Sequence, residues 1–199
     1  MRINLSSTKD RYYSQLNNEL DPYVACQVTS MVMGLDIGGF WLNPITRLNC
    51  PYQQPEDKLR WFMLNDTGVQ TFWKRNHPNS KIPAPEWASC MVFAVNLLYE
   101  RNIVFFDENI TIQKIITDIN NGLPVYLSMK YPHNKNFSGN PAPVSGHIVL
   151  AVGYDNDKLI INDPYKNHIT GDKNGWNNIY SPEDFQRFRN GHGIRYRRS

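Results

Sequence analysis

The hydrophobic pattern of the chain changes period near residue 123. Before that point, apolar side chains recur three and four positions apart, which is the spacing of one face of a helix. This spacing predicts four helices: residues 28–35, a helix that starts at Pro55, residues 85–101 and residues 111–122. Thr111 is a suitable N-cap for the last helix, and Gly122 is a suitable stop.

Beyond residue 123 the apolar residues form short runs bounded by turn residues. These runs predict strands over residues 124–129, 147–155 and 158–163, with a tight hairpin turn at residues 155–157. A short late helix is expected to open at Ser181. Helices followed by a strand meander are typical of an α+β domain, with N-terminal helices packed on an antiparallel sheet. Without a repeat or linker, we expect one domain over residues 1–199, with residues 38–85 as an elaborated middle.

Charge and hydropathy then exclude several classes of protein. The net charge of +3 is too small to indicate a nucleic-acid partner. No apolar stretch approaches the roughly 18 residues of a membrane span, and the N-terminus lacks the apolar core of a signal peptide. We therefore expect a soluble chain that is made in the cytoplasm and does not insert into a membrane. The basic run at the end of the sequence indicates a solvated tail, which could also favour an anionic surface; it consists of Arg195, Arg197 and Arg198.

The three cysteines are Cys26, Cys50 and Cys90, an odd number that indicates no disulfide framework and no zinc motif. Cys26 stands where the first helix begins, and unpaired N–H groups with the positive end of the helix dipole favour the nucleophilic thiolate there. A small buried apolar side chain is the alternative. Cys90 lies in mid-helix and is expected in the core, whereas Cys50 lies in a loop without an evident role.

A nucleophilic cysteine needs a base, and His147 is the one histidine that begins a strongly apolar strand. The other four lie in polar, loop-like contexts and are expected to be solvated. The hairpin makes Asp163 a cross-strand neighbour of His147, within about 4.5–5.5 Å at Cβ. A third group of this kind holds the tautomer and orientation of an imidazole base. Asn162 is a rival for that role, and only one of the two can serve because adjacent strand residues face opposite sides.

Four segments resemble the double-glycine, bacteriocin-processing-like cysteine peptidases: "YYSQLNNELDPYVACQVTSMVM", "GHIVLAVGYD", "INDPY" and "GWNNIYSPEDF". The first is similar to that family's nucleophile region, the second to its histidine strand, the third to its Asn-Asp-Pro-aromatic segment and the fourth to its C-terminal region. The resemblance covers residues 12–36 and 111–190, and the middle segment matches no family that we can name.

The resemblance implies a papain-like fold with Cys26 as nucleophile, His147 as base and acid, and Asp163 as the orienting group. It also implies Gln15 as the oxyanion donor beside the Cys26 backbone N–H. Gln27 follows the cysteine where family members often carry other residues, so it is a second amide near the thiol and a rival donor. No metal or organic cofactor is expected for such chemistry.

The expected activity is that of a cysteine peptidase acting on a peptide or peptidoglycan substrate. We expect a peptidoglycan endopeptidase, a lytic enzyme of the phage endolysin kind, that acts on the cell wall after release. An intracellular maturation protease, a papain-fold acyltransferase and a catalytically silent binding module are the alternatives. Residues 130–146 and 38–85 are expected to rim the cleft, with Trp176 and Tyr165 as substrate-binding candidates.

Overall fold

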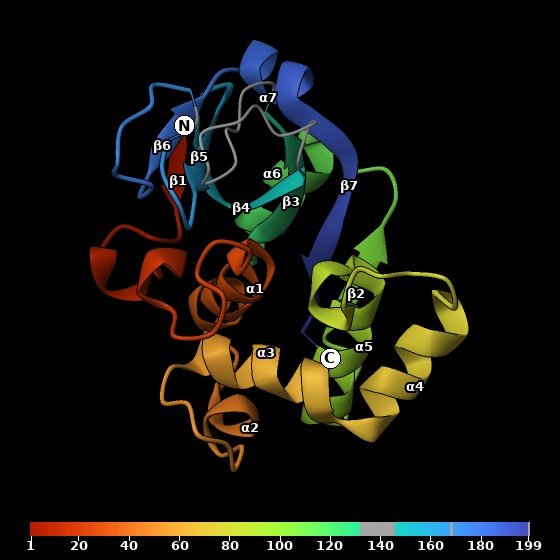
Figure 1. Ribbon diagram of the computed structural model, residues 1–199. Helices are drawn as coiled ribbons and strands as arrows, with labels where there is room; N and C mark the ends of the chain where they lie inside the picture. Colours follow the sequence, from red (N-terminus) through yellow and green to blue (C-terminus); the bar gives the residue numbers. More distant parts are fainter. Residues whose placement is uncertain (132–145, 168, 199) are drawn as a thin grey trace.

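A computed structural model of the chain describes residues 1–131, 146–167 and 169–198 (Figure 1). The helices are α1 (Cys26–Ile37), α2 (Asn43–Thr46), α3 (Pro55–Asn65), α4 (Thr67–Asn76), α5 (Ala88–Tyr99), α6 (Ile112–Asn120) and α7 (Pro182–Phe188). The strands are β1 (Arg2–Asn4), β2 (Val104–Asp107), β3 (Val125–Lys130), β4 (Gly146–Asp155), β5 (Lys158–Asn162), β6 (Asn178–Tyr180) and β7 (Arg189–Tyr196). The predicted α+β class is confirmed.

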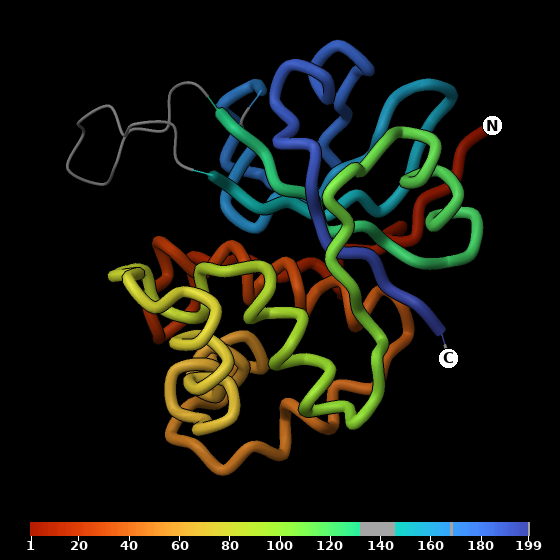
Figure 2. The backbone as a smooth tube through the Cα atoms, turned by 90° about the vertical axis from the view of Figure 1, so that its right-hand side faces the viewer, coloured from red at the N-terminus to blue at the C-terminus, as the bar shows by residue number. Residues whose placement is uncertain are grey.

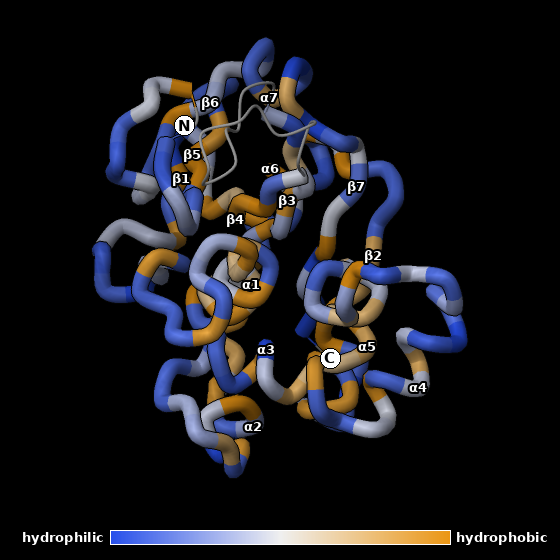
Figure 3. The backbone as a smooth tube through the Cα atoms, viewed as in Figure 1, coloured by the Kyte–Doolittle hydropathy of each residue, from blue (hydrophilic) through white to orange (hydrophobic). Residues whose placement is uncertain are grey.

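The strands form one antiparallel sheet in the order β2-β7-β3-β4-β5-β6, and β1 pairs with β4 at the Asp155 end. Helices α1 to α5 form a layer beside this sheet, as Figure 2 shows. Alternate residues of β4 face two separate cores. Ile148 and Leu150 pack with α1 and the other N-terminal helices, while Val149 and Ala151 pack with α6 and α7. Hydrophobic residues accordingly gather along α5 and the central strands (Figure 3).

Local signals explain several element ends. Pro55 begins α3 at the position where its missing N–H costs no hydrogen bond. The Oγ1 atom of Thr111 accepts from the backbone N–H of Lys114 at 3.2 Å and caps α6, and Gly122 ends that segment with a φ of +73°. The hairpin turns at Asn156, whose φ is +55°, as the sequence predicts.

The helix predicted over residues 85–101 begins later than expected. Residues Ala84–Glu86 form a separate 3₁₀ turn, and Trp87 is extended before α5 starts at Ala88. The proline at residue 85 therefore opens a short turn rather than the long helix.

The prediction that the C-terminal arginines form a solvated tail is wrong for Arg195. This residue lies in β7, which pairs with β2 on one side and β3 on the other. Its guanidinium donates to both carboxylate oxygens of Asp118, at 2.6 and 2.8 Å, and to Asp107 at 3.2 Å. Arg195 therefore joins the sheet to α6, and only Arg197 and Arg198 are exposed.

Candidate active site

Cys26 is the first residue of α1, and its side chain is half-buried. The N-cap residue, Ala25, makes no side-chain capping bond, and the first turn holds no acidic residue. The amide groups and dipole at this helix end are thus not neutralised by a capping side chain, which favours an anion beside them. Helix α1 is fixed on the sheet in part by Ser30, whose hydroxyl donates to the carbonyl of Ile148 at 3.3 Å.

His147 lies near the start of β4 and is 6% exposed. Its Nε2 lies 2.8 Å from Oδ1 of Asp163. Burial by itself lowers the pKa of His147, but the Asp163 carboxylate and the hydrogen bonds with Asp163 and Cys26 raise that pKa to about 10. The arrangement thus favours a protonated His147 between the Cys26 side chain and the Asp163 carboxylate.

Asp163 follows β5 directly and is fully buried. Its Oδ1 also accepts from the backbone N–H groups of Tyr165 and Lys166, at 2.9 and 3.3 Å. Its own backbone is held on both sides, since its N–H donates to Gly175 and its carbonyl accepts from the Tyr12 hydroxyl, both at 2.8 Å. The carboxylate is therefore fixed by its own Asp-Pro turn as well as by the histidine.

The predicted register of this hairpin is wrong, although His147 and Asp163 do meet. Leu150 is opposite Asn162, and a bulge interrupts the pairing between Ala151 and Gly153. Continuing that pairing would place Asp163 opposite Val149 rather than opposite His147. The contact is therefore diagonal, made after β5 has ended, and depends on the Asp-Pro turn.

Asn162, the rival to Asp163, points elsewhere. Its Nδ2 donates to Oγ of Ser6 at 3.0 Å, and its Oδ1 accepts from the backbone N–H of Asn177 at 3.0 Å. Both amide functions are thereby used to hold the N-terminal segment and the loop before β6.

Gln15 and Gln27 differ in how their amides are held. The Nε2 atom of Gln15, a residue that is 2% exposed, donates to the carbonyl of Pro22 at 2.9 Å. Its Oε1 has no hydrogen-bond partner among the described residues. Gln27 instead accepts through Oε1 from the hydroxyl of Tyr126, a fully buried residue of β3, at 2.9 Å. Each amide therefore keeps an N–H that these bonds do not use.

Trp176 and Tyr165 lie in the segments that follow Asp163. The indole N–H of Trp176 donates to the carbonyl of Ser6 at 3.2 Å, so this side chain anchors the N-terminal segment. The ring of Tyr165 lies 5.5 Å from the Lys166 amine. Their roles in substrate binding stay predictions, and residues 132–145 of the expected cleft rim lie outside the described residues.

A pair of buried tyrosines beside His147 was missed by the sequence reasoning. The ring of Tyr131 lies 5.8 Å from the His147 ring, and its hydroxyl lies 2.7 Å from that of Tyr180. Burial raises the pKa of Tyr131 well above its ordinary value, so its hydroxyl stays neutral. No motif announces the pair, although Tyr131 directly follows the strand that pairs with His147.

The other cysteines and histidines lie apart from these groups. Cys90 is fully buried in the core as predicted, and burial raises the pKa of its thiol. Cys50 lies in a loop with its sulfur 3.9 Å from the Tyr52 carbonyl. The expectation of solvated loop histidines is wrong for two residues: His77 stacks on Trp87 at 3.9 Å, and His192 belongs to β7. His133 and His168 lie outside the described residues.

The described residues form neither a metal-binding cluster nor a membrane-spanning helix. Within residues 1–131, 146–167 and 169–198, no cluster of three or more His, Cys, Asp and Glu side chains is arranged to hold a metal ion. In the same part of the chain, no helix combines the length and apolar character needed to cross a membrane.

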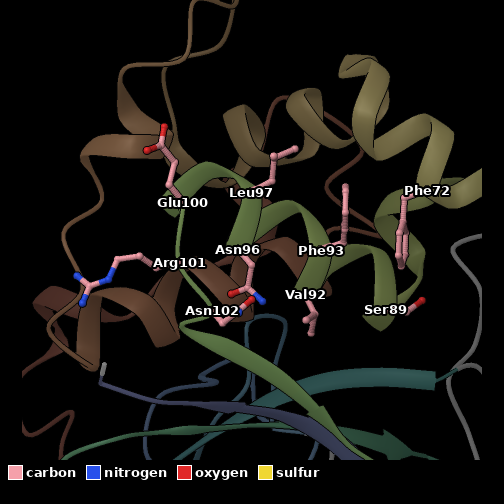
Figure 4. Close-up of a pocket in the computed structure, with 9 residues that line it drawn as sticks. All are labelled: Phe72, Ser89, Val92, Phe93, Asn96, Leu97, Glu100, Arg101 and Asn102. Atoms are coloured by element: carbon pink, nitrogen blue, oxygen red, sulfur yellow. The ribbon is translucent and has the colours of Figure 1, made fainter.

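A surface hollow of about 430 Å³ lies along α5 (Figure 4). Its lining residues belong to α4, α5 and the turn after α5: Phe72, Ser89, Val92, Phe93, Asn96, Leu97, Glu100, Arg101 and Asn102. None of them is a candidate for the chemistry, so the hollow is separate from the candidate active site.

This fold, with N-terminal helices packed on an antiparallel sheet, is that of the papain-like cysteine peptidases. The model of the Peptidase_C39 like family matches residues 9–188, so the chain belongs to that family. A crystal structure described as a "putative C39-like peptidase" from Bacillus anthracis has a TM-score of 0.62 and 19% identity, covering 100% of this chain and 98% of that one. No curated protein matches the chain significantly in sequence. Membership of the family suggests a cysteine peptidase.

Proposed function

We propose that the chain hydrolyses peptide bonds with Cys26 as nucleophile, His147 as general acid and base, and Asp163 as the group that orients His147. One observation carries the proposal: Nε2 of His147 lies 2.8 Å from the buried Asp163 carboxylate, and the same imidazole interacts with the Cys26 side chain. Because Asp163 occupies Nε2, Nδ1 is the nitrogen that remains to exchange a proton with the thiol and the substrate.

The reaction follows from these positions. The Cys26 thiolate attacks the carbonyl carbon, and the carbonyl electrons move onto oxygen. Collapse of this intermediate breaks the C–N bond while His147 protonates the leaving amine. His147 then takes a proton from water, which attacks the thioester and releases the acid and Cys26.

The oxyanion of both intermediates requires hydrogen-bond donors. We assign this role to the Cys26 backbone N–H and the side-chain amide of Gln15, with Gln27 as the competing amide. Removing one such donor typically lowers kcat by about 10²–10³. Gln15→Ala should show that loss, and Gln27→Ala should change kcat less. The reverse order would assign the oxyanion to Gln27.

Cys26→Ala is the decisive variant for the nucleophile. It should abolish peptide cleavage and leave the thermal unfolding temperature near that of the parent chain, because Cys26 is only half-buried. Cys50→Ala is the matched control and should retain activity. Mass analysis of products with and without an added amine separates hydrolysis from acyl transfer. Full cleavage by Cys26→Ala would contradict the mechanism.

For the substrate, we propose the peptide cross-bridges or stem peptides of bacterial peptidoglycan, cut by a lytic enzyme of the endolysin kind. The net charge of +3 supports attraction to an anionic wall, although a fold and a nucleophile do not fix the substrate. Purified walls should lose turbidity and release new amino termini with the parent chain but not with Cys26→Ala. Intact walls from several bacterial types, together with Cys26-dependent cleavage of a protein such as casein, would favour a maturation protease instead.

A further inference from the structure

The segment between Gln15 and Cys26 has little regular structure of its own. After the short 3₁₀ turn of Gln15–Asn17, the chain passes through bends and turns to the start of α1, and Asp21 takes a φ of +53°. Both proposed oxyanion donors depend on this segment, here named the approach loop (residues 16–25). A displacement of about 1 Å can lower a rate about 10²-fold, so the loop needs support from elsewhere.

Asp57, in the first turn of α3, supplies part of that support. Its carboxylate is fully buried and accepts from the backbone N–H of Glu19 at 2.9 Å and of Leu20 at 3.0 Å. An acidic residue in the first turn of a helix ordinarily serves that helix. Here the two oxygens bind consecutive amides 38 and 37 positions earlier in the chain. A buried carboxylate is costly unless hydrogen-bonded, and these bonds meet that requirement.

Arg60 lies one turn further along α3 and holds the next part of the approach loop. Its side chain is 3% exposed and donates to Asp21 at 3.0 Å and to Glu86 at 2.7 Å. Arg60 therefore links the approach loop to the 3₁₀ turn before α5. Gln54, just before α3, adds a bond to the carbonyl of Asn17 at 2.8 Å.

We propose that Asp57 and Arg60 are positioning residues for catalysis, which hold the approach loop so that Gln15 and the Cys26 N–H face the oxyanion together. This inference rests on the proposed function. The inference also gives a role to the middle segment, residues 38–85, which carries no recognisable motif. Helix α3 of this segment supplies both positioning residues. The proposed role differs from an ordinary structural role, because loss of Asp57 or Arg60 should weaken the oxyanion site more than it lowers the reactivity of Cys26.

Two probes separate these effects. A short peptide aldehyde reacts with the Cys26 sulfur to form a hemithioacetal, in which the S–C bond forms and the carbonyl oxygen takes the proton. That oxygen occupies the oxyanion site. Iodoacetamide alkylates the thiolate with loss of iodide and makes no such demand. Aldehyde affinity thus reports the oxyanion site, and the alkylation rate reports the nucleophile.

Asp57→Asn should weaken aldehyde binding by about 10-fold or more and lower kcat similarly, with a smaller change in KM. Its alkylation rate at Cys26 should change by less than about 2-fold. The matched control is Asp66→Asn at the other end of α3, because Asp66 also accepts a backbone N–H, from Val69 at 2.9 Å, but does not touch the approach loop. The control should leave both probes unchanged.

Arg60→Lys provides a second test if Asp57→Asn does not fold, since an amine cannot hold Asp21 and Glu86 as the guanidinium does. The inference is overturned if aldehyde affinity falls no more than in Asp66→Asn, or if aldehyde affinity and alkylation fall by the same factor. A parent chain that is alkylated at Cys26 but neither binds the aldehyde nor cleaves peptides would overturn the proposed function as well.

Discussion

The orientation of one imidazole ring determines how the candidate site can work. With Nε2 of His147 placed at 2.8 Å from Asp163, the proposed mechanism assigns the acid–base chemistry to Nδ1. The Asp163 carboxylate also accepts two backbone N–H groups, so its position does not depend on the histidine alone. A neutral amide in its place could keep the geometry and lose the charge.

Asp163→Asn should therefore lower kcat by about 10⁴-fold without unfolding the chain, because an amide can leave the imidazole in the wrong tautomer and no longer stabilises the imidazolium. Steady-state kinetics measures the loss, and thermal unfolding checks the fold. Asp172→Asn is the matched control: Asp172 is an exposed aspartate after Asp163 that also accepts a backbone N–H, from Asn174. An unchanged kcat in Asp163→Asn would remove Asp163 from the mechanism.

The raised pKa of His147 predicts an unusual pH dependence. Because this pKa is about 10 in the folded chain and about 6.5 in an unfolded chain, the imidazolium persists through neutral pH. Its contribution to stability is fully present below about pH 6.5 and is lost as the pH rises toward 10. The alkaline limb of kcat/KM should fall near pH 10, and in Asp163→Asn it should move to lower pH. A limb near pH 6.5 in the parent chain would contradict the assignment.

At the scale of elements, those with complete local signals could be predicted from the sequence. Helix α6 has its apolar face, the Thr111 cap and the Gly122 stop, and the β4–β5 hairpin has its turn residues. Strand β7 was missed because "RNGHGIRY" contains two glycines and three basic side chains, and its apolar partners come from β2 and β3. The bulge between Ala151 and Gly153 was also invisible, because it depends on packing rather than on residue type.

Helix α3 carries a further titratable group in its first turn. Glu56 is 2% exposed, and burial raises its pKa to about 7, with the neighbouring Asp57 adding to the shift. Since the unfolded chain loses this proton first, the group lowers stability as the pH rises from about 4.5 to 7. Its Oε2 has no hydrogen-bond partner among the described residues.

Glu56→Gln should therefore stabilise the chain above pH 7 by about 1–2 kcal/mol, and by progressively less as the pH falls toward 4.5. Thermal or urea unfolding between pH 4.5 and 8 measures the difference. Glu183→Gln, in the first turn of α7 and exposed, is the comparison and should not show that rise with pH. A Glu56→Gln chain that is less stable than the parent at pH 8 would show that the ionised carboxylate is stabilised by the helix end.

At the scale of the whole molecule, the candidate site combines two layers. Cys26 comes from the helical layer, whereas His147 and Asp163 come from the sheet and the turn that follows it. The His147–Asp163 contact could be anticipated because a hairpin joins the two strands. The approach of Cys26 could not be derived from spacing, since it depends on how α1 packs on β3 and β4. The resemblance to a peptidase family supplied that step.

Side chains of β7, α6 and β2 form a joint at Arg195. Arg195 binds Asp118 through two donors and Asp107 through a third, and its side chain is 19% exposed. Burial raises the pKa of Asp107, but hydrogen bonds from Lys114, Asn109 and Arg195 hold this pKa below its ordinary value. Removing the guanidinium would leave two largely buried carboxylates with less compensation.

Arg195→Ala should lower the free energy of unfolding by about 2 kcal/mol at pH 7, whereas Arg198→Ala, which removes an exposed arginine three residues later, should change it by less than about 0.5 kcal/mol. Because the lowered pKa of Asp107 means that its contribution is present above about pH 4 and lost as the pH falls, the gap between the two variants should narrow in acid. Urea unfolding at pH 7 and pH 3 measures both effects. Equal stability of the two variants at pH 7 would support the solvated-tail interpretation of Arg195. It would also show that the Arg195 contacts do not help to hold the sheet to α6.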